Sequence, residues 1–207
     1  MRIKDTISWL VVLVLVSIGV TALAAFFLLG QDPENTATNN SDPNGFNVPD
    51  IDAEQQDAQD TGGPQDKSLS ITVPKMDRVE DATVPDAAGD DEEALGDYAA
   101  IHLKGTGFPW QEEANVYLAG HRLGYPNTES FLAFWDLDEL QNGDEVFVED
   151  ADGTEYNYRV FDSFIVNPDD TWVIDPVPGK NILTLQTCTL PDYSQRLIVQ
   201  AELVSRA

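Results

Sequence analysis

The chain has 207 residues, with 11 basic and 37 acidic side chains, a formal charge of −26, one cysteine and two histidines. One cysteine excludes an internal disulfide and a cysteine-rich zinc site. A charge this negative argues against a nucleic-acid partner, because phosphate binding requires lysine and arginine side chains. The length allows one domain of ordinary size plus additional segments.

The N-terminal segment predicts a membrane anchor. Residues 7–29 are almost wholly apolar and carry no charge. As a helix they would extend roughly 35 Å, enough to cross a bilayer core of about 30 Å. Arg2 and Lys4 precede them, so the positive-inside rule predicts a cytoplasmic N-terminus and an extracellular remainder. We therefore expect residues 1–30 to form a cytoplasmic tip and a single-pass transmembrane helix in the cell membrane.

A cleaved signal peptide is the alternative for this segment. Residues 22–24 read Ala-Leu-Ala, which resembles a small-residue cleavage site. The apolar run is longer than in most signal peptides and continues through residues 26–29, which favours a retained anchor. Under either interpretation the rest of the chain is exported.

Residues 31–68 have the composition of a disordered acidic spacer. They are rich in Asp, Asn, Gln, Pro and Gly, and they contain nine acidic residues but one basic residue, Lys67. No helical or strand period persists along them. As a flexible coil they would span roughly 35 Å and hold a domain away from the membrane. A lid that folds over an active site is the less favoured alternative.

Residues 69–207 are predicted to form the folded, extracellular domain, and strand patterns dominate it. Many short strands with one brief helix are typical of an all-β, closed or nearly closed barrel. We expect strands at residues 69–73, 115–121, 146–148, 156–166, 172–174, 181–188 and 196–204, a helix within 129–140, and an irregular acidic segment at 77–97.

The last two predicted strands carry the most information. Alternate residues of a strand share a face, so Cys188 lies opposite the face of Leu183 and Leu185. The connection between the two strands is only seven residues long, which favours antiparallel neighbours. Cys188 ends one strand and Arg196 begins the next. We therefore expect these two residues to lie side by side at one rim of the barrel.

A lone cysteine can be an inert buried thiol or a nucleophile, and the strand pattern leaves both interpretations open. A nucleophilic thiol requires a base or a charged partner, because the thiolate is the reactive form. His102 and His121 are the only histidines, and by pattern alone either could be structural. No close ligand spacing links the histidines to the cysteine, so no metal site is expected among them.

Four motifs resemble those of the sortase family, and the resemblance covers essentially all of residues 69–207. The segment 184–188, Thr-Leu-Gln-Thr-Cys, resembles the sortase signature Thr-Leu-x-Thr-Cys. The segment 119–122, Ala-Gly-His-Arg, resembles the one that holds the sortase histidine. Arg196 matches the family's arginine, and residues 102–106 resemble an upstream His-x-x-Gly-Thr segment whose histidine is not catalytic.

The resemblance implies a sortase-type closed β-barrel of about eight strands, with one or two short helices. It also implies a cysteine transpeptidase of Gram-positive bacteria. Such an enzyme cleaves a C-terminal sorting signal, of the Leu-Ala-x-Thr-Gly or Leu-Pro-x-Thr-Gly type, between Thr and Gly. Cys188 would form a thioacyl intermediate, His121 would serve as general acid and then base, and Arg196 would stabilise the developing oxyanion.

The implied partners are exported proteins that carry a sorting signal and an amine acceptor of the cell wall or of a pilin. Water could replace the amine and produce hydrolysis of the same bond. The closing segment 193–199 is most similar to class E of the family. Class E chains often read Thr-Cys-His-Pro, whereas Thr189, Leu190 and Pro191 follow the cysteine here. The Asp-Pro-aromatic lid motif of pilus-polymerising sortases is missing.

Two further alternatives remain from the sequence. A barrel of the same fold could bind sorting signals or envelope peptides without turnover. The acidic segment 77–97 could bind calcium through hard oxygen ligands, although it has no EF-hand spacing and a solvated charge run is favoured. No other cofactor is expected. The Ser-His-Gly-Cys motif of L,D-transpeptidases, which act on peptidoglycan, is missing.

Overall fold

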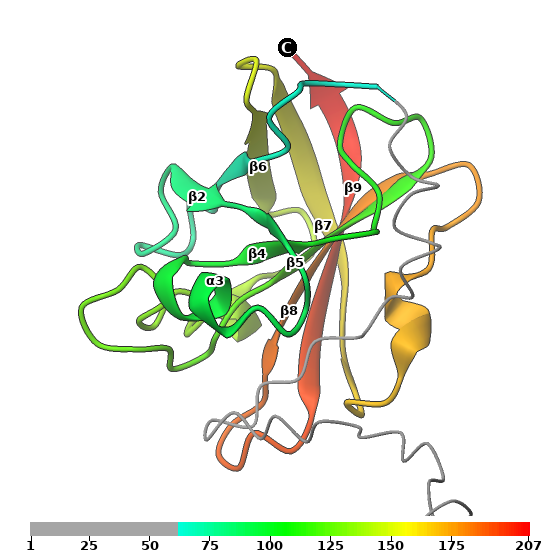
Figure 1. Ribbon diagram of the computed structural model, residues 1–207. Coiled ribbons are helices and arrows are strands. Elements are labelled where there is room, and N and C mark those ends of the chain that lie inside the picture. Colours follow the sequence, from blue (N-terminus) through cyan, green and yellow to red (C-terminus); the bar gives the residue numbers. More distant parts are fainter. Residues whose placement is uncertain (1–61) are drawn as a thin grey trace, which may run out of the picture. The chain divides into compact units, whose positions relative to one another are not determined.

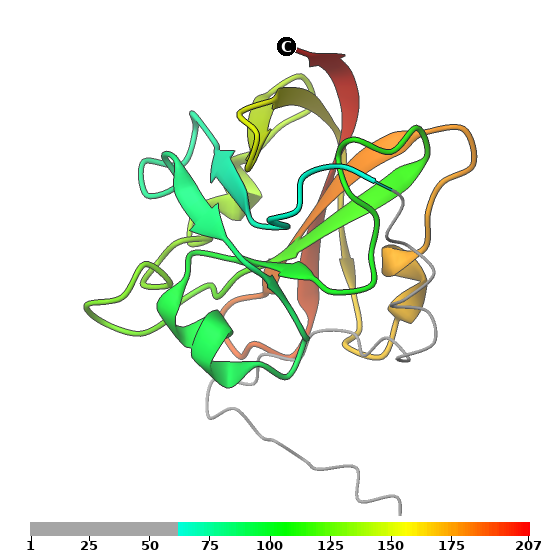
Figure 2. The ribbon, with the colours of Figure 1, turned by 45° about the horizontal axis from the view of Figure 1, so that its top comes forward.

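The computed structural model describes residues 62–207, which form a nearly closed, all-β barrel with few helices (Figures 1 and 2). In chain order its elements are β1 (Leu69–Thr72), β2 (Ala82–Val84), β3 (Asp86–Ala87), α3 (Glu92–Asp97), β4 (Ile101–Leu103), β5 (Ala114–Ala119), the 3-10 helix η1 (Leu137–Glu139), β6 (Glu145–Asp150), β7 (Glu155–Val166), the 3-10 helix η2 (Thr171–Ile174), β8 (Asn181–Cys188) and β9 (Arg196–Arg206).

The described strands form one sheet with the order β2-β1-β6-β7-β9-β8-β5-β4-β3. The β5–β8 and β3–β4 pairs are parallel, and every other neighbouring pair is antiparallel. Register shifts between β7 and β9, at residues 157/158 and 160/162, allow the two longest strands to bend. The expectation of an all-β barrel is confirmed, with nine strands where about eight were predicted and a barrel that is nearly closed.

Two separate hydrophobic clusters occupy opposite faces of the central strands. In β5, Val116 and Leu118 belong to one cluster, whereas Tyr117 and Ala119 belong to the other. Strand β8 is buried along its whole length for the same reason. The first cluster also contains Leu183 and Leu185, and the second also contains Cys188, Ile198 and Val173. The predicted separation of Cys188 from the two core leucines is therefore confirmed. The face of β8 that carries Cys188 is also buried, in the second cluster.

The helix predicted within residues 129–140 is largely wrong. Turns fill most of this range, and the only helical element is the single turn η1. Leu132 has a positive φ of 57°, which a helix excludes, and its amide donates to the carbonyl of Leu123 across the loop. Leu137 and Leu140 are buried, whereas Trp135 is exposed. Local turn bonds between residues three apart, together with two bonds to residues 121 and 123, stand in place of the bonds of an α-helix.

Two other predicted segments also differ from the structure. The strand expected at residues 172–174 is the 3-10 helix η2. The acidic segment 77–97 is not irregular throughout, because it contains β2, β3 and α3. The Asp91 carboxylate accepts from the amide of Ala94 and caps α3, and Glu92 and Glu93 occupy its first turn. Negative charge at a helix N-terminus is stabilising, so part of the acidity is structural.

The N-terminal predictions lie mostly outside the described residues. This applies to the membrane anchor at residues 7–29 and to the spacer up to residue 61. Within residues 62–207 no helix has the length and apolar character needed to cross a membrane. Residues 62–68, which were predicted as spacer, contact the domain: Pro64 is buried, and the Lys67 ammonium lies over the stacked rings of Phe108 and Trp110.

Candidate active site

Cys188 and Arg196 are directly opposite each other in the β8–β9 ladder. Opposed residues of antiparallel strands project to the same face, with Cβ atoms about 5 Å apart. Each of the two side chains is 2% exposed. The predicted proximity of the two residues is thus confirmed, and it is a consequence of register. Figure 1 shows β8 and β9 side by side, joined at their lower ends by the connection of residues 189–195.

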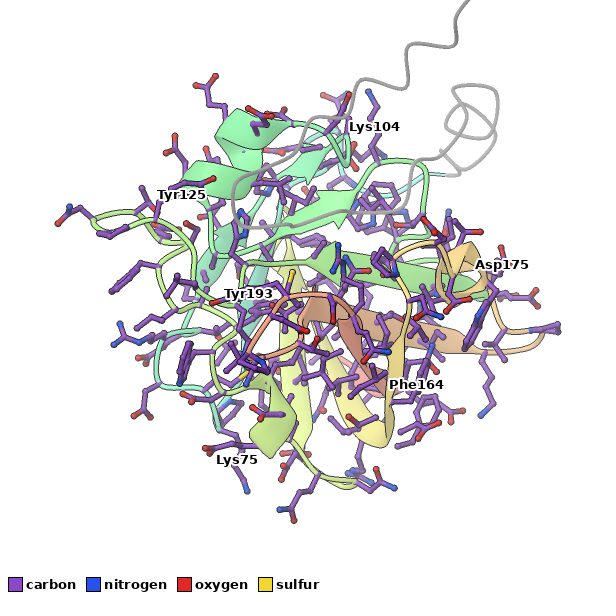
Figure 3. All side chains as sticks on the ribbon, turned by 90° about the horizontal axis from the view of Figure 1, so that it is seen from below. Lys75, Lys104, Tyr125, Phe164, Asp175 and Tyr193 are labelled. Atoms are coloured by element: carbon purple, nitrogen blue, oxygen red, sulfur yellow. The ribbon has the colours of Figure 1, made fainter. Side chains whose placement is uncertain are left out.

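The guanidinium of Arg196 also organises this connection. Its Nη1 donates to the carbonyl oxygens of Tyr193 and Gln195, each at 3.1 Å. Tyr193 has a positive φ of 58° and packs against the cluster that contains Cys188. Figure 3 shows Tyr193 between Tyr125 on one side and Phe164 on the other. Arg196 therefore holds its own loop in place and keeps a buried positive charge beside the thiol.

His121 reaches the same rim from β5. This strand is parallel to β8, with Ala119 opposite Gln186. Two hydrogen bonds extend the contact: the Gly120 amide donates to the Gln186 carbonyl at 3.0 Å, and the Thr187 hydroxyl donates to the Gly120 carbonyl at 2.8 Å. Continuing the register by two residues brings His121 level with Cys188.

The environment of His121 is enclosed. Its side chain is 3% exposed, and its ring meets the Tyr125 ring edge-on at 5.5 Å. The backbone carbonyl of His121 accepts from the amide of Phe134, which fixes the start of the following loop. The ring contact constrains the imidazole, and the backbone bond constrains the chain that carries it.

Gly120 permits this close approach of β5 and its neighbours. A Cβ atom at this position would lie 2.6 Å from the carbonyl oxygen of Ala99 and 3.1 Å from the ring of Phe134. Neither contact is relieved by rotating a flexible side chain. The glycine before His121 is thus required by packing and not by an unusual backbone conformation.

His102 occupies the other face of the sheet. It pairs with Leu118, whose side chain lies in the first cluster, whereas Cys188 lies in the second. Its Nδ1 is 2.8 Å from the Asp86 carboxylate, and its Nε2 is 3.0 Å from the Gly107 carbonyl oxygen. The ring is fully buried and tilted against Phe108. These contacts join β3, β4 and the following loop, which is a structural role.

Tyr117 and Gln186 belong to the site although the sequence analysis did not select them. Both side chains are buried on the Cys188 face, and the Tyr117 hydroxyl donates to Gln186 Oε1. Burial raises the pKa of Tyr117 well above its ordinary value, and the positive charge of Arg196 opposes this in part. The sequence signal for Tyr117 was its alternation with Ala119 and His121 along one strand face.

Within the part of the chain that the structure describes, the acidic residues do not gather around a common centre. Among residues 62–207, no group of three or more His, Cys, Asp or Glu side chains has the geometry to hold a metal ion. Within the segment 77–97, Asp86 contacts His102 and Asp91 caps α3.

The site therefore consists of a buried thiol, a histidine and an arginine that meet at the ends of three adjacent strands. Such a set has the components of a cysteine nucleophile, a proton-transfer partner and a charged donor. The family model described as "Sortase domain" matches residues 71–204. The chain belongs to the sortase family.

Two relatives show the extent of the similarity. Sortase A of Streptococcus agalactiae serotype III (strain NEM316) is 37% identical over 89 residues, 43% of this chain and 36% of that protein. Sortase SrtE1 of Streptomyces coelicolor (strain ATCC BAA-471 / A3(2) / M145) is 32% identical over 150 residues, 65% of this chain and 39% of that protein. The chain thus matches less than half the length of either relative.

Solved structures agree with the fold. Sortase C1 from Streptococcus agalactiae superposes with a TM-score of 0.60 and 27% identity, over 75% of this chain and 78% of that one. Sortase A from Corynebacterium diphtheriae gives a TM-score of 0.58 and 26% identity, over 70% of this chain and 63% of that one.

Proposed function

We propose that this protein is a cysteine transpeptidase that cleaves C-terminal sorting signals between Thr and Gly and transfers the threonyl group to an amine of the cell envelope. The observation that carries the proposal is the direct opposition of Cys188 and Arg196, with His121 level with the cysteine on the adjacent strand. Family membership supports the reaction type.

In the first half-reaction the proton of the Cys188 thiol passes to His121, and the sulfur attacks the threonyl carbonyl carbon. Negative charge develops on the carbonyl oxygen, where the Arg196 guanidinium stabilises it. The carbon–nitrogen bond then breaks, and His121 gives a proton to the departing glycine amine. The product is a thioester between Cys188 and the threonine, with the glycine fragment released.

In the second half-reaction an amine of the envelope attacks the thioester carbon. His121 accepts the proton that this amine loses, and the carbon–sulfur bond breaks to regenerate Cys188. When water takes the place of the amine, the same steps give hydrolysis. Cell-wall and pilin amines are the proposed acceptors, and exported proteins with a sorting signal are the proposed donors.

The cellular setting belongs to the same proposal. The apolar residues 7–29 would anchor the protein in the membrane of a Gram-positive cell, with the N-terminus in the cytoplasm and the barrel outside. Residues 31–61 would serve as the spacer. The class E assignment, with its preference for Leu-Ala-x-Thr-Gly, is supported by the similarity to sortase SrtE1 over 65% of the chain.

The test combines full-length protein with Leu-Ala-x-Thr-Gly or Leu-Pro-x-Thr-Gly peptides and an amine acceptor, and it follows products by mass spectrometry. Wild-type protein should release the glycine fragment, form the ligated product and carry the peptide as a covalent adduct on Cys188. Cys188→Ala should give neither product nor adduct. Peptide binding by wild-type protein without any cleavage would instead identify a non-catalytic binding barrel.

A further inference from the structure

Asn115 is the second residue of β5, where its buried side chain joins three parts of the domain. Its Nδ2 donates to the backbone carbonyl oxygens of Val173 at 2.8 Å and Asp175 at 3.1 Å. Its Oδ1 accepts from the Thr184 hydroxyl of β8 at 2.7 Å. Both amide protons and the amide oxygen are therefore used. Such a fully satisfied buried amide fixes the position of whatever it binds.

The segment that Asn115 binds is the connection between β7 and β8, residues 167–180, which includes η2. This connection adds no strand to the sheet, so its position depends on hydrogen bonds from outside. Near its β8 end, the Gly179 amide donates to Glu113 and the Lys180 carbonyl accepts from Ala114. Its middle is held by the two bonds from Asn115. A 3-10 turn of four residues has few internal bonds of its own.

The segment that Asn115 holds shares a hydrophobic cluster with the thiol. Val173 is buried in the cluster that contains Cys188, and Ile174 packs against that cluster. Trp172 stacks on Phe164, with ring centroids 5.6 Å apart, and is more than half exposed. Figure 3 shows Asp175, at the end of η2, on the opposite side of the domain from Tyr125.

The spacing of residues along β8 indicates how an extended peptide bound at Cys188 would lie relative to η2. Thr184, which bonds Asn115, precedes Cys188 by four residues on the same face of β8. Four residues of strand span about 13 Å, which is also the reach of roughly four residues of extended peptide. A peptide whose carbonyl carbon lies at the Cys188 sulfur can therefore reach the height of η2 with the residues N-terminal to the cleaved bond.

We propose that Asn115 is a positioning residue for the acyl donor: it holds η2 at the height where the extended sorting-signal peptide passes on its way to Cys188. This inference rests on the proposed transpeptidase function. Asn115 does not touch the reacting atoms. Its loss should therefore weaken capture of the peptide and leave the chemical step intact.

The test compares Asn115→Asp and Asn115→Ala with Thr184→Val in the full-length protein. Asn115→Asp keeps the size and the acceptor for Thr184, but it directs a carboxyl oxygen at the carbonyls of Val173 and Asp175. Asn115→Ala removes every bond of the side chain. Thr184→Val is the matched control, because it removes a bond at the other end of the same amide and leaves both loop bonds in place.

The expected results are faster hydrogen exchange near η2 and a higher KM for the peptide. Hydrogen exchange at residues 171–175 should accelerate by about tenfold in both Asn115 variants, while β6 and β7 keep their protection. The KM for the sorting-signal peptide should rise by about fivefold or more with kcat within about twofold. Thr184→Val should lower stability and leave both readouts near wild type. If one Asn115 variant fails to fold, the other supplies the measurement.

Three outcomes would overturn the proposal: unchanged exchange at residues 171–175, a fall in kcat at constant KM, or equal effects of Thr184→Val.

A second experiment distinguishes a failure of this proposal from a failure of the proposed function. The Kd of the peptide is measured by fluorescence anisotropy for Cys188→Ala with and without Asn115→Ala. A wild type without turnover would contradict the transpeptidase, while the exchange and Kd measurements would still decide the role of Asn115.

Discussion

Cys188 and Arg196 face each other across the β8–β9 ladder as the last residue of one strand and the first of the next. Their proximity is set by backbone register, so it does not depend on long flexible side chains finding each other. The seven-residue connection that joins them is in turn bound by the Arg196 guanidinium through Tyr193 and Gln195. The arginine therefore has both a structural and a proposed electrostatic role.

The two roles of Arg196 can be separated with Arg196→Lys. A lysine keeps the positive charge, but it does not have the several N–H donors that a guanidinium presents in one plane. We expect kcat to fall by about 100-fold, comparable to the loss of one oxyanion donor, with a small change in thermal stability. Kinetics on the sorting-signal peptide and thermal unfolding check this. Arg196→Lys with wild-type kcat would contradict the oxyanion role.

The two histidines should give opposite phenotypes. His102→Ala leaves the Asp86 carboxylate and the Gly107 carbonyl without their buried partner, so the free energy of unfolding should fall by about 2–4 kcal/mol. Its activity at low temperature should stay within a few-fold of wild type, because His102 lies on the other face of the sheet from Cys188. His121→Ala should abolish turnover and cost much less stability.

Urea unfolding and peptide turnover at about 10 °C measure both phenotypes. Loss of turnover in His102→Ala protein that is still folded would contradict the assignment. It would mean that His102, and not His121, supplies the proton-transfer group.

Gly120→Ala should disturb the site through packing. The new methyl group would meet the Ala99 carbonyl oxygen and the Phe134 ring, so β5 must shift at the residue before His121. We expect a stability loss of about 1–3 kcal/mol together with a lower kcat. Gly96→Ala, within α3, is the matched control. Its Cβ would make only ordinary 3.7 Å contacts with the side chain of Tyr125. The control should be neutral or slightly stabilising. Equal stability of the two variants would contradict the packing argument.

Stability should decline in the alkaline range because of buried tyrosines. Burial, together with the hydrogen bond to Asp150, raises the pKa of Tyr156 to about 12, and burial also raises the pKa of Tyr158. The folded state then holds these protons more tightly than the unfolded state, where the tyrosine pKa is about 10. The contribution of Tyr156 is fully present below pH 10 and is lost as pH rises from about 10 to about 12, whereas the decline from Tyr158 continues to higher pH.

Urea unfolding from pH 8 to 11.5 measures this decline, and Tyr156→Phe should flatten it. At pH 8 the variant should lose about 1 kcal/mol through the missing hydrogen bond to Asp150. Its stability curve should then approach the wild-type curve as pH rises. Parallel curves for the two proteins would contradict the role of Tyr156.

The parts of the fold that depend on local pattern were predictable. The alternation in residues 181–188 and 196–204 predicted two antiparallel strands, the face of Cys188 and its pairing with Arg196, and all three are confirmed. Alternation is informative there because each face of a strand packs against a different set of residues. The strands at residues 146–148 and 156–166 were also predicted, and β6 and β7 pair there as an antiparallel hairpin.

The errors fall where long-range contacts override local preference. Residues 129–140 have helical spacing, yet hydrogen bonds to residues 121–123 hold them as turns. Residues 172–174 have strand-like composition, yet they form η2, and Asn115 binds the carbonyl oxygens of Val173 within it and of Asp175 just after it. In both cases the deciding partner is distant in sequence, so the segment itself contains no signal for it.

The sequence by itself determined the residue types of the site, the order in which they occur and the face that carries the cysteine, because period and motif are properties of short segments. The strand pattern left both histidines open and only the family resemblance favoured His121, whereas the tertiary structure shows which histidine lies on the face and at the level of Cys188. The parallel pairing of β5 with β8 brings His121 level with Cys188, whereas the pairing of β4 with β5 turns His102 to the opposite face. It also decided the partners of Asn115 and Tyr117, since a buried side chain acquires its hydrogen bonds only from groups that folding brings to it.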